Sequence, residues 1–195
     1  MHLLHCAATL SPRVEITAAI LLRKTSLSET SFIITWLSEA HGKIKTVAKG
    51  ARRPKSPFAG KLDLFFNAEI QWIRSRKSDL HTLKEVVLTE PFEGLRAQYP
   101  RTQLAAYFVE LIELVTEPEH ATPELYELLH RAFSYLNNGR PTQRALLHFE
   151  SETVRLLGIH GQPDVTPAVA VGRAFGRLPR GRAELLKQLI AAVRP

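Results

Sequence analysis

Residues 66–72, Phe-Asn-Ala-Glu-Ile-Gln-Trp, alternate between apolar and polar side chains. Successive side chains of a β-strand point to opposite faces, so this period of two predicts a strand with one face against a core. Residues 26–28 predict a turn, and the Gly and Pro residues of 50–61 predict a loop. Four further apolar or β-branched runs have strand length: residues 16–22, 30–37, 43–48 and 80–89.

Five short strands within about 75 residues, with one long loop after the third, suit a small Greek-key barrel of the oligonucleotide/oligosaccharide-binding (OB) type. An SH3-like barrel fits the strand count nearly as well. We place a domain boundary near Glu90-Pro91, because the composition shifts there and a proline opposes continuing a strand.

From residue 91 onward, apolar side chains recur with the period of a helix. Thr122-Pro123-Glu124 predicts a helix start, Asn138-Gly139 its end, and Pro141 the start of another helix that Gly158 stops. Residues 183–193 predict a last amphipathic helix. Residues 158–181 contain five Gly and three Pro, which puts their order in doubt.

The sequence therefore predicts an α+β protein of two domains, an N-terminal five-stranded OB-type barrel and an all-α helical domain. We expect residues 1–14 to be an N-terminal extension, residues 15–90 to form the nucleic-acid-binding barrel and residues 91–195 to form the helical domain.

The composition excludes several classes of protein. The chain has 195 residues, of which 45% are hydrophobic and 23% charged, as in globular proteins. No apolar run approaches the roughly 20 residues that cross a bilayer, so a transmembrane protein is not expected. The single Cys excludes a disulfide framework or a four-Cys zinc site within the chain and suits a reducing cytoplasm.

Residues 1–14 lack the basic start and unbroken apolar stretch of a secretory leader. His2, His5 and Cys6 are a candidate metal-ligand set, but no second ligand pair follows at zinc spacing. A frayed terminus is the better interpretation, and we expect no metal and no cofactor.

The net charge of +7 is unevenly spread. Residues 1–90 carry 14 Lys and Arg against 8 Asp and Glu, whereas residues 91–195 carry 12 against 11. A positive barrel directs attention to an acidic partner, and nucleic acid is the foremost of these.

Residues 41–61 hold seven cations and no Asp or Glu. Lys43, Lys45 and Lys49 share parity on the predicted strand, so they emerge on one face, with Ile44 and Ala48 inward. Val47 then points with the lysines, a conflict that a bulge would remove. The predicted DNA-binding residues are Lys43, Lys45, Lys49, Arg52, Arg53, Lys55 and Lys61, with Arg74 and Arg76 extending the patch.

Closely spaced cations of this kind can follow a polyphosphate backbone, with affinity that comes from counterion release. A membrane surface and an ordinary solvated face are the weaker alternatives. Most of the aromatic residues of this half are expected in the core. Phe58 is the exception, because it sits in the Pro-rich loop and is expected to be exposed for stacking on bases.

Enzyme signals are weak. The sequence contains no phosphate-binding loop, dinucleotide fingerprint, nucleophile elbow or zinc-protease motif. Glu110 with Glu113, and His148 with Glu152, have the spacing of proton-sharing or ligand pairs, but solvated helix faces explain them better. We expect no catalytic residues and no enzymatic activity, and a hydrolase is a distant alternative.

Residues 41–56, HGKIKTVAKGARRPKS, closely resemble the signature of the RecO family of bacterial recombination mediators. Other segments agree in order: SETSFIITWLSEAHGK (28–43), DLHTLKEVVLTEPFEGLR (79–96), LAAYFVELIELVTE (104–117) and PELYELLHRAFSYL (123–136). The resemblance covers roughly residues 15–165 and implies an OB-fold domain followed by a helical domain.

The resemblance also implies activity and partners. RecO proteins bind single- and double-stranded DNA, anneal complementary strands and work with the RecR protein. Together they load the RecA recombinase onto strands coated by single-stranded-DNA-binding protein (SSB). It therefore implies a non-enzymatic role in recombinational repair, at the nucleoid in the cytoplasm. A basic OB protein that acts on RNA, such as a chaperone, is the alternative that composition leaves open.

The resemblance implies one departure and one further site. Many RecO proteins carry a four-Cys zinc module after a stretch like residues 156–165, but here no Cys follows, so we expect the zinc module to be absent. The SSB tail is acidic and ends in an apolar residue with its carboxylate, so it needs an apolar pocket rimmed by cations. The candidate residues, for which bundle core is the competing interpretation, are Leu104, Tyr107, Phe108, Leu111, Arg131 and Arg144.

Overall fold

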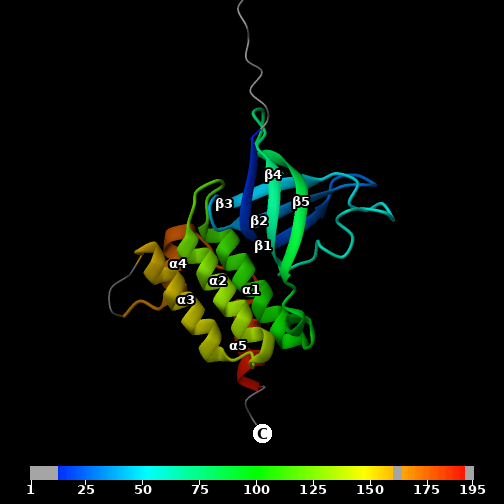
Figure 1. Ribbon diagram of the computed structural model, residues 1–195. Coiled ribbons are helices and arrows are strands. Elements are labelled where there is room, and N and C mark those ends of the chain that lie inside the picture. Colours follow the sequence, from blue (N-terminus) through cyan, green and yellow to red (C-terminus); the bar gives the residue numbers. More distant parts are fainter. Residues whose placement is uncertain (1–12, 160–163, 192–195) are drawn as a thin grey trace, which may run out of the picture.

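The computed structural model describes residues 13–159 and 164–191. A five-stranded barrel forms the N-terminal half, and the helices gather beneath it on one side (Figure 1). The candidate metal set His2, His5 and Cys6 lies outside the described residues. Within those residues no three His, Cys, Asp or Glu side chains are grouped to hold a metal ion. None of the described helices is both long and apolar enough to span a membrane.

The barrel is closed in the strand order β1-β2-β3-β5-β4. β3 pairs parallel with β5, and the other neighbours are antiparallel, so the OB-type barrel expected from the sequence is confirmed. The strands are β1 (Val14–Ser26), β2 (Phe32–Ser38), β3 (Gly42–Ala48), β4 (Asn67–Ile73) and β5 (Leu80–Glu90).

The first strand is longer than predicted and serves two neighbours. Its first part pairs with β4 and its second part with β2, with a bulge between Leu21 and Arg23. The alternation of residues 66–72 is reproduced in β4, where Ala68, Ile70 and Trp72 face the barrel interior. The outer side of β1 instead supplies Ile20 and Leu22 to the core shared with the helices.

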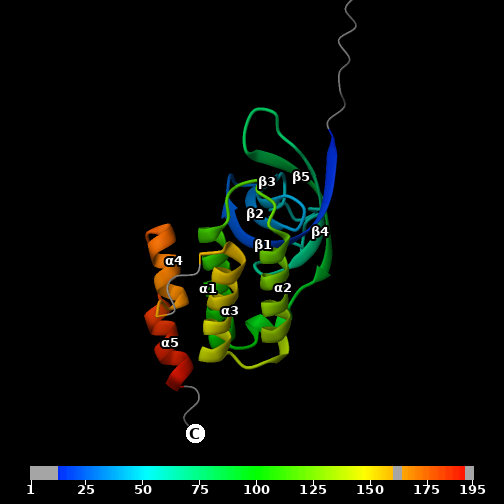
Figure 2. The ribbon, with the colours of Figure 1, turned by 90° about the vertical axis from the view of Figure 1, so that its left-hand side faces the viewer.

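The helical half begins with a short 3₁₀ turn and three long helices. α2 begins at Pro123 and ends before Gly139, and α3 ends at Gly158 in a left-handed conformation, as the sequence predicts. In Figure 2, α4 and α5 form a second layer beside α1 and α3. The elements are η1 (Glu93–Arg96), α1 (Tyr99–Val115), α2 (Pro123–Asn138), α3 (Gln143–Leu157), α4 (Pro167–Phe175) and α5 (Arg182–Ala191).

The doubt about the order of residues 158–181 is not borne out for the described part of that stretch, because α4 lies within it. The Thr166 side chain accepts a hydrogen bond from the Val169 backbone N–H, and Pro167 occupies the first turn. Residues 160–163 lie outside the described part of the chain.

The loop between α1 and α2 joins the two halves by pairing with the start of β3. The backbone N–H of Glu119 donates to the Lys43 carbonyl at 2.9 Å, and Pro118 forms a bridge with Lys43. Gly42 permits this approach, because it has a φ of +67° and an added Cβ would lie 1.8 Å from the His120 carbonyl oxygen. Together with the hydrophobic core that β1 shares with the helices, this contact joins the barrel to the helical half.

Candidate nucleic-acid interface

The basic loop, residues 49–66 between β3 and β4, is anchored by its own apolar residues. Phe58 is only 6% exposed and packs into the barrel core with Leu62. The expectation that Phe58 is exposed for base stacking is therefore wrong. The loop folds back over the barrel interior, and burial of this ring stabilises the loop rather than presenting it to a ligand.

Backbone contacts fix the start of the loop against the turn between β1 and β2. The Arg52 N–H donates to the Thr30 carbonyl at 3.0 Å, and the Gly50 N–H donates to the Ser31 hydroxyl at 3.3 Å. The Arg52 guanidinium donates to the Ser28 carbonyl at 2.9 Å. Figure 1 shows these two segments side by side at the right of the barrel. We call these two segments, the β1–β2 turn and the basic loop of residues 49–66, the platform.

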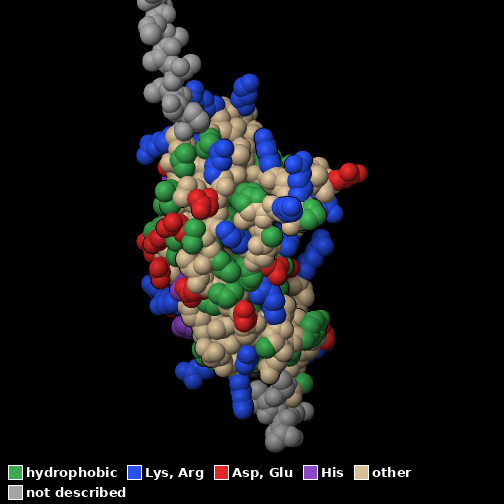
Figure 3. Space-filling view, turned by 45° about the vertical axis from the view of Figure 1, so that its right-hand side comes forward, with side chains coloured by type: hydrophobic (Ala, Val, Ile, Leu, Met, Phe, Trp, Pro, Cys, Tyr) green, Lys and Arg blue, Asp and Glu red, His purple; other side chains and the backbone are tan. Residues whose placement is uncertain are grey.

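Most Lys and Arg side chains of this platform are available to bind a ligand. Within the described ranges, the side chains of Lys49, Arg53, Lys55 and Lys61 make no hydrogen bond or ion pair with the protein. In Figure 3, Lys and Arg side chains surround the projecting loops of the barrel, with one acidic side chain at the tip of the projection, while a group of acidic side chains lies along the opposite edge. The platform therefore carries an excess of positive charge, because its five Lys and Arg residues outnumber Glu29 and Asp63.

Phe32 lies at the base of the platform between two cations. The Arg52 guanidinium lies 5.6 Å from the centre of its ring, and the Lys24 ammonium lies 5.5 Å from it. Lys24 also donates to the Leu62 carbonyl at 2.9 Å. Sequence reasoning missed Lys24, whose proximity to the loop results from the pairing of β1 with β2.

The face of β3 only partly matches the prediction. Ile44 and Ala48 are buried in the barrel as expected, and Lys45 is exposed on the outer face. Val47 shares that face and is half-buried. No bulge relieves it, because β3 pairs with β2 in unbroken register.

Lys43 is engaged inside the protein. Its ammonium donates to the carbonyl oxygens of Glu113 at 2.8 Å and of Thr116 at 2.6 Å, at the C-terminus of α1. Burial lowers the pKa of Lys43 below its usual value, against the opposing effect of Glu113. We therefore remove Lys43 from the set of proposed phosphate contacts.

Arg74 and Arg76 do not extend the platform. They lie in the turn between β4 and β5, which stands at the top of the barrel in Figure 1, away from the basic loop. Arg74 forms an ion pair with Glu119 and lies 5.1 Å from the Trp72 ring centre. Its charge is thus compensated by the protein's own carboxylate. Arg76 is exposed in the same turn.

A groove of about 520 Å³ opens between α1, α2 and α3. Phe108 and Phe149 stack within it, with ring centres 4.0 Å apart. Arg131 and Arg144 lie at its rim, as the predicted partner site requires. Sequence reasoning missed Leu128, Tyr135 and Phe149, because helical periodicity does not show which helix faces flank a groove.

Three of the residues predicted for this pocket belong to the core instead. Leu104, Tyr107 and Leu111 are buried and do not line the groove. The Tyr107 hydroxyl donates to the Glu150 carboxylate, and burial raises the pKa of Tyr107 well above its ordinary value. Their inclusion in the site was wrong, and Phe108 alone of the four apolar residues reaches the groove.

In each of the two pairs noted in the sequence, one member forms an ion pair with an arginine instead. Glu113 accepts two hydrogen bonds from Arg23, at 3.1 and 2.5 Å. Glu152 accepts from Arg155 rather than from His148. Neither pair forms a proton-sharing site.

Family models match both halves of the chain. The Recombination protein O N-terminal model matches residues 14–92, which include the whole barrel, and the C-terminal model matches residues 96–176. The chain is 34% identical to the DNA repair protein RecO of Rhodopirellula baltica over 140 residues, which are 72% of this chain and 52% of that protein. It is 31% identical to the DNA repair protein RecO of Salinibacter ruber over 156 residues, 80% of this chain and 60% of that protein.

The matches therefore span between half and three fifths of the length of these two relatives. The two family models cover the barrel, the basic loop and the three long helices that form the groove. By its fold and by these matches over both halves, the chain belongs to the RecO family.

Proposed function

We propose that this protein is a non-enzymatic DNA-binding protein of recombinational repair. It binds single- and double-stranded DNA through the basic loop, anneals complementary strands, and with RecR helps load recombinase onto SSB-coated single strands. The observation that carries the proposal is the group of cations Lys49, Arg53, Lys55 and Lys61, whose side chains are unpaired, on a loop anchored by the buried Phe58. A DNA partner places this activity at the nucleoid, in the cytoplasm.

The proposed binding is electrostatic. Phosphate contacts release condensed counterions, so affinity falls with salt at a log–log slope of about −0.7 per contact for a single strand and about −0.9 for a duplex. With four to six contacts among Lys45, Lys49, Arg52 and the other loop cations, the expected slope is about −3 to −5.

Annealing follows from the same charges. A protein that screens the repulsion between two phosphate backbones lowers the barrier to their pairing without breaking a bond. The activity consumes no nucleotide, which agrees with the lack of a phosphate-binding loop in the sequence.

The direct test is strand annealing with SSB-coated complementary oligonucleotides. The loop variant R52Q/R53Q/K55Q is compared with K84Q/R140Q/K187Q, which removes the same charge from three exposed positions elsewhere. We expect the loop variant to anneal roughly tenfold more slowly or worse, and the control to match the wild type. Equal rates for all three proteins would remove the basic loop from the mechanism. A parallel affinity measurement with RNA of equal length tests the RNA-binding alternative.

We propose a second interface in the groove between α1, α2 and α3. The ligand is the acidic C-terminal tail of SSB, with its last apolar side chain against Phe108 and Phe149 and its carboxylates near Arg131 and Arg144. An apolar floor with a cationic rim supports this assignment, because such a groove complements both parts of the peptide.

A further inference from the structure

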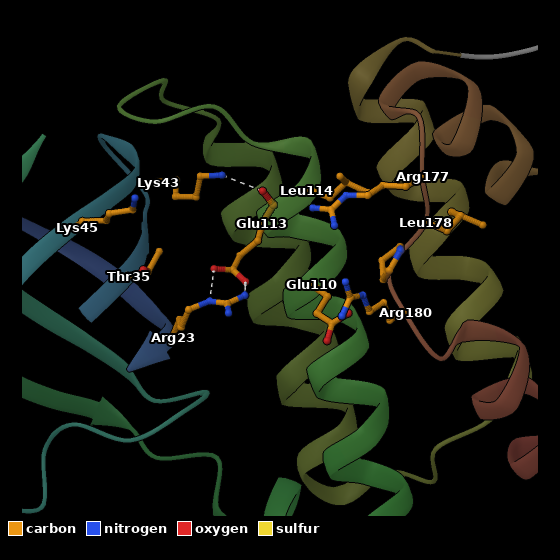
Figure 4. Close-up of a pocket in the computed structure, with 11 residues that line it drawn as sticks. Arg23, Thr35, Lys43, Lys45, Glu110, Glu113, Leu114, Arg177, Leu178 and Arg180 are labelled. Atoms are coloured by element: carbon orange, nitrogen blue, oxygen red, sulfur yellow. Dashed lines mark hydrogen bonds and ion pairs between the residues drawn. The ribbon is translucent and has the colours of Figure 1, made fainter. Parts of the chain in front are cut away.

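A second basic site lies between the barrel and the helices. A cleft of about 560 Å³ is bounded by the outer face of β1–β3, by α1 and by the segment between α4 and α5. Figure 4 shows Lys43 and Lys45 reaching toward it from the barrel and Arg177 from the opposite side, with Glu113 between them. Five cations and two carboxylates line this cleft.

Part of this charge is used within the protein. Arg23 and Glu113 neutralise each other in a two-bond ion pair, and Lys43 is bonded to carbonyls of α1. The side chains of Lys45, Arg177 and Arg180 make no ion pair or hydrogen bond within the described ranges. Three cations therefore face the cleft without compensation, against the single unpaired carboxylate of Glu110.

The segment that carries the two arginines is held firmly. Pro179 is buried and Leu178 packs against the helical core, so Arg177 and Arg180 flank an apolar anchor. Directly after it, the Arg182 guanidinium donates to both carboxylate oxygens of the buried Glu150, at 2.6 and 2.8 Å. The two arginines are thus presented from a fixed backbone, which lowers the entropic cost of binding an anion between them.

The cleft is continuous with the barrel surface that leads to the basic loop. Arg23, Thr35 and Lys45 lie in one row across β1, β2 and β3. Lys49 follows Lys45 by four residues, which is about 13 Å along an extended chain. Between them, Val47 and its partner Ile33 are half-buried. A DNA strand that leaves the cleft therefore crosses this apolar strip and then reaches the cations of the basic loop.

We propose that this cleft binds one or two nucleotides of the single strand held by the basic loop, with a phosphodiester between Lys45 and the arginines Arg177 and Arg180. The inference rests on the proposed DNA-binding function and adds a second contact to it. Arg177 and Arg180 lie beyond residue 176, where the match to the C-terminal family model ends, so the cleft is completed by a part of this chain that the model does not cover.

The size and lining of the cleft favour a single strand. A volume of about 560 Å³ accommodates a ligand of small-molecule size. A duplex, whose major groove alone is about 12 Å wide, does not enter it. The apolar lining of Leu114 and Leu178 beside the cations matches a nucleotide, which carries a flat base as well as a phosphate.

The test is the salt dependence of binding of a 15-nucleotide oligothymidine to the full chain, measured by fluorescence anisotropy. R177Q/R180Q removes two of the three cations that surround the single phosphodiester, so we expect the log–log slope to flatten by about 0.7 units. R177K/R180K keeps the charge and is expected to keep most of the slope. The control R173Q/K187Q removes the same charge from α4 and α5 outside the cleft and is expected to behave as wild type.

Glu110 provides a variant that is expected to gain affinity. E110Q removes the one unpaired negative charge from the cleft, so we expect the oligothymidine to bind about two- to fivefold more tightly. Thermal unfolding of every variant checks that the fold is kept, and an unchanged affinity of E110Q would count against a phosphate in the cleft.

The possible outcomes separate this inference from the proposed function. If R177Q/R180Q keeps the wild-type slope while the loop variant R52Q/R53Q/K55Q loses it, the cleft inference is overturned and the basic loop stands. If only R177Q/R180Q loses slope, the cleft binds the strand and the assignment of the basic loop as a DNA contact is wrong. Inorganic tripolyphosphate is the remaining arm. If it raises the unfolding temperature of the wild type but not of R177Q/R180Q, and the oligothymidine slope is unchanged, the cleft binds free phosphate and not a strand.

Discussion

The ammonium of Lys43 donates a 2.6 Å hydrogen bond to the carbonyl oxygen of Thr116, at the C-terminus of α1. A cation at this end of a helix complements the helix dipole and satisfies a carbonyl that the helix leaves unpaired. Lys43 lies on a strand whose lysines the sequence predicts to contact DNA, but it holds the barrel to the helices instead.

Lys43→Met is therefore expected to destabilise the protein by about 1–3 kcal/mol, because it leaves two carbonyl oxygens without their donor. Urea unfolding measures this loss. Lys45→Met, at the exposed neighbouring position, is expected to change stability by less than about 0.5 kcal/mol and to reduce the salt dependence of DNA binding instead. If Lys43→Met instead reduced the salt dependence of DNA binding without destabilising the protein, Lys43 would belong to the DNA-binding interface.

Phe58→Ala is expected to cost about 3–5 kcal/mol of unfolding free energy, because it empties a position in the barrel core. It should also weaken DNA binding, since the loop loses its anchor. Phe58→Leu keeps most of the apolar volume and is expected to retain both properties. A Phe58→Ala variant with wild-type stability but weak binding would show that the ring contacts DNA.

His81 is expected to make the stability of the barrel fall as the pH drops. Its Nδ1 accepts from the Ser75 N–H at 3.2 Å, and its Nε2 lies 3.1 Å from a carboxylate oxygen of Glu119. Burial lowers the pKa of His81 below the ordinary 6.5, reinforced by Arg74 and opposed by Glu119 and Asp79. The unfolded chain therefore takes up the proton first.

The stabilisation by neutral His81 is complete above pH 6.5 and is lost progressively as the pH falls from there toward its folded-state pKa. Urea unfolding from pH 8 to pH 5 measures this loss. His81→Gln should lose that part of the pH dependence, whereas the exposed His120→Gln should retain it. Identical pH profiles for wild type and His81→Gln would contradict the assignment.

The groove between α1, α2 and α3 is tested with an acidic peptide that ends in an apolar residue. R131Q/R144Q is expected to weaken its binding roughly tenfold without a change in stability, because both arginines are exposed. Amidation of the peptide's C-terminus should also weaken binding. R140Q/R173Q removes equal charge outside the groove and is the control. Equal binding of free and amidated peptide would exclude a carboxylate contact.

The variant Leu104→Ala distinguishes a role of Leu104 in the core from a role in peptide binding at the groove. Leu104 is fully buried and does not line the groove, so its truncation is expected to cost about 2–5 kcal/mol of stability. Peptide affinity at a temperature where the variant is folded should change little.

Local pattern was enough to predict the barrel. The strict alternation of residues 66–72 reappears as the inward face of β4, and Gly139 and Gly158 end their helices as predicted. The Thr166-Pro167 signal for α4 was present but lay in a Gly- and Pro-rich stretch that obscured it.

The positions of single side chains depended on contacts that no local pattern carries. Lys43 has the same strand parity as Lys45, and only the packing of α1 over one of them distinguishes their roles. Phe58 lies in a loop whose Gly and Pro residues predict irregular backbone but do not show that it folds back into the barrel. Arg177 and Arg180 line the same cleft as Lys45 only in the folded chain.

The central claim is that the basic loop binds polynucleotide phosphates, and the salt dependence of oligothymidine binding tests it most directly. Replacing Arg52, Arg53 and Lys55 by Gln is expected to flatten the log–log slope by about two units, while K84Q/R140Q/K187Q keeps the wild-type slope. A loop variant whose slope equals that of the wild type would contradict the account.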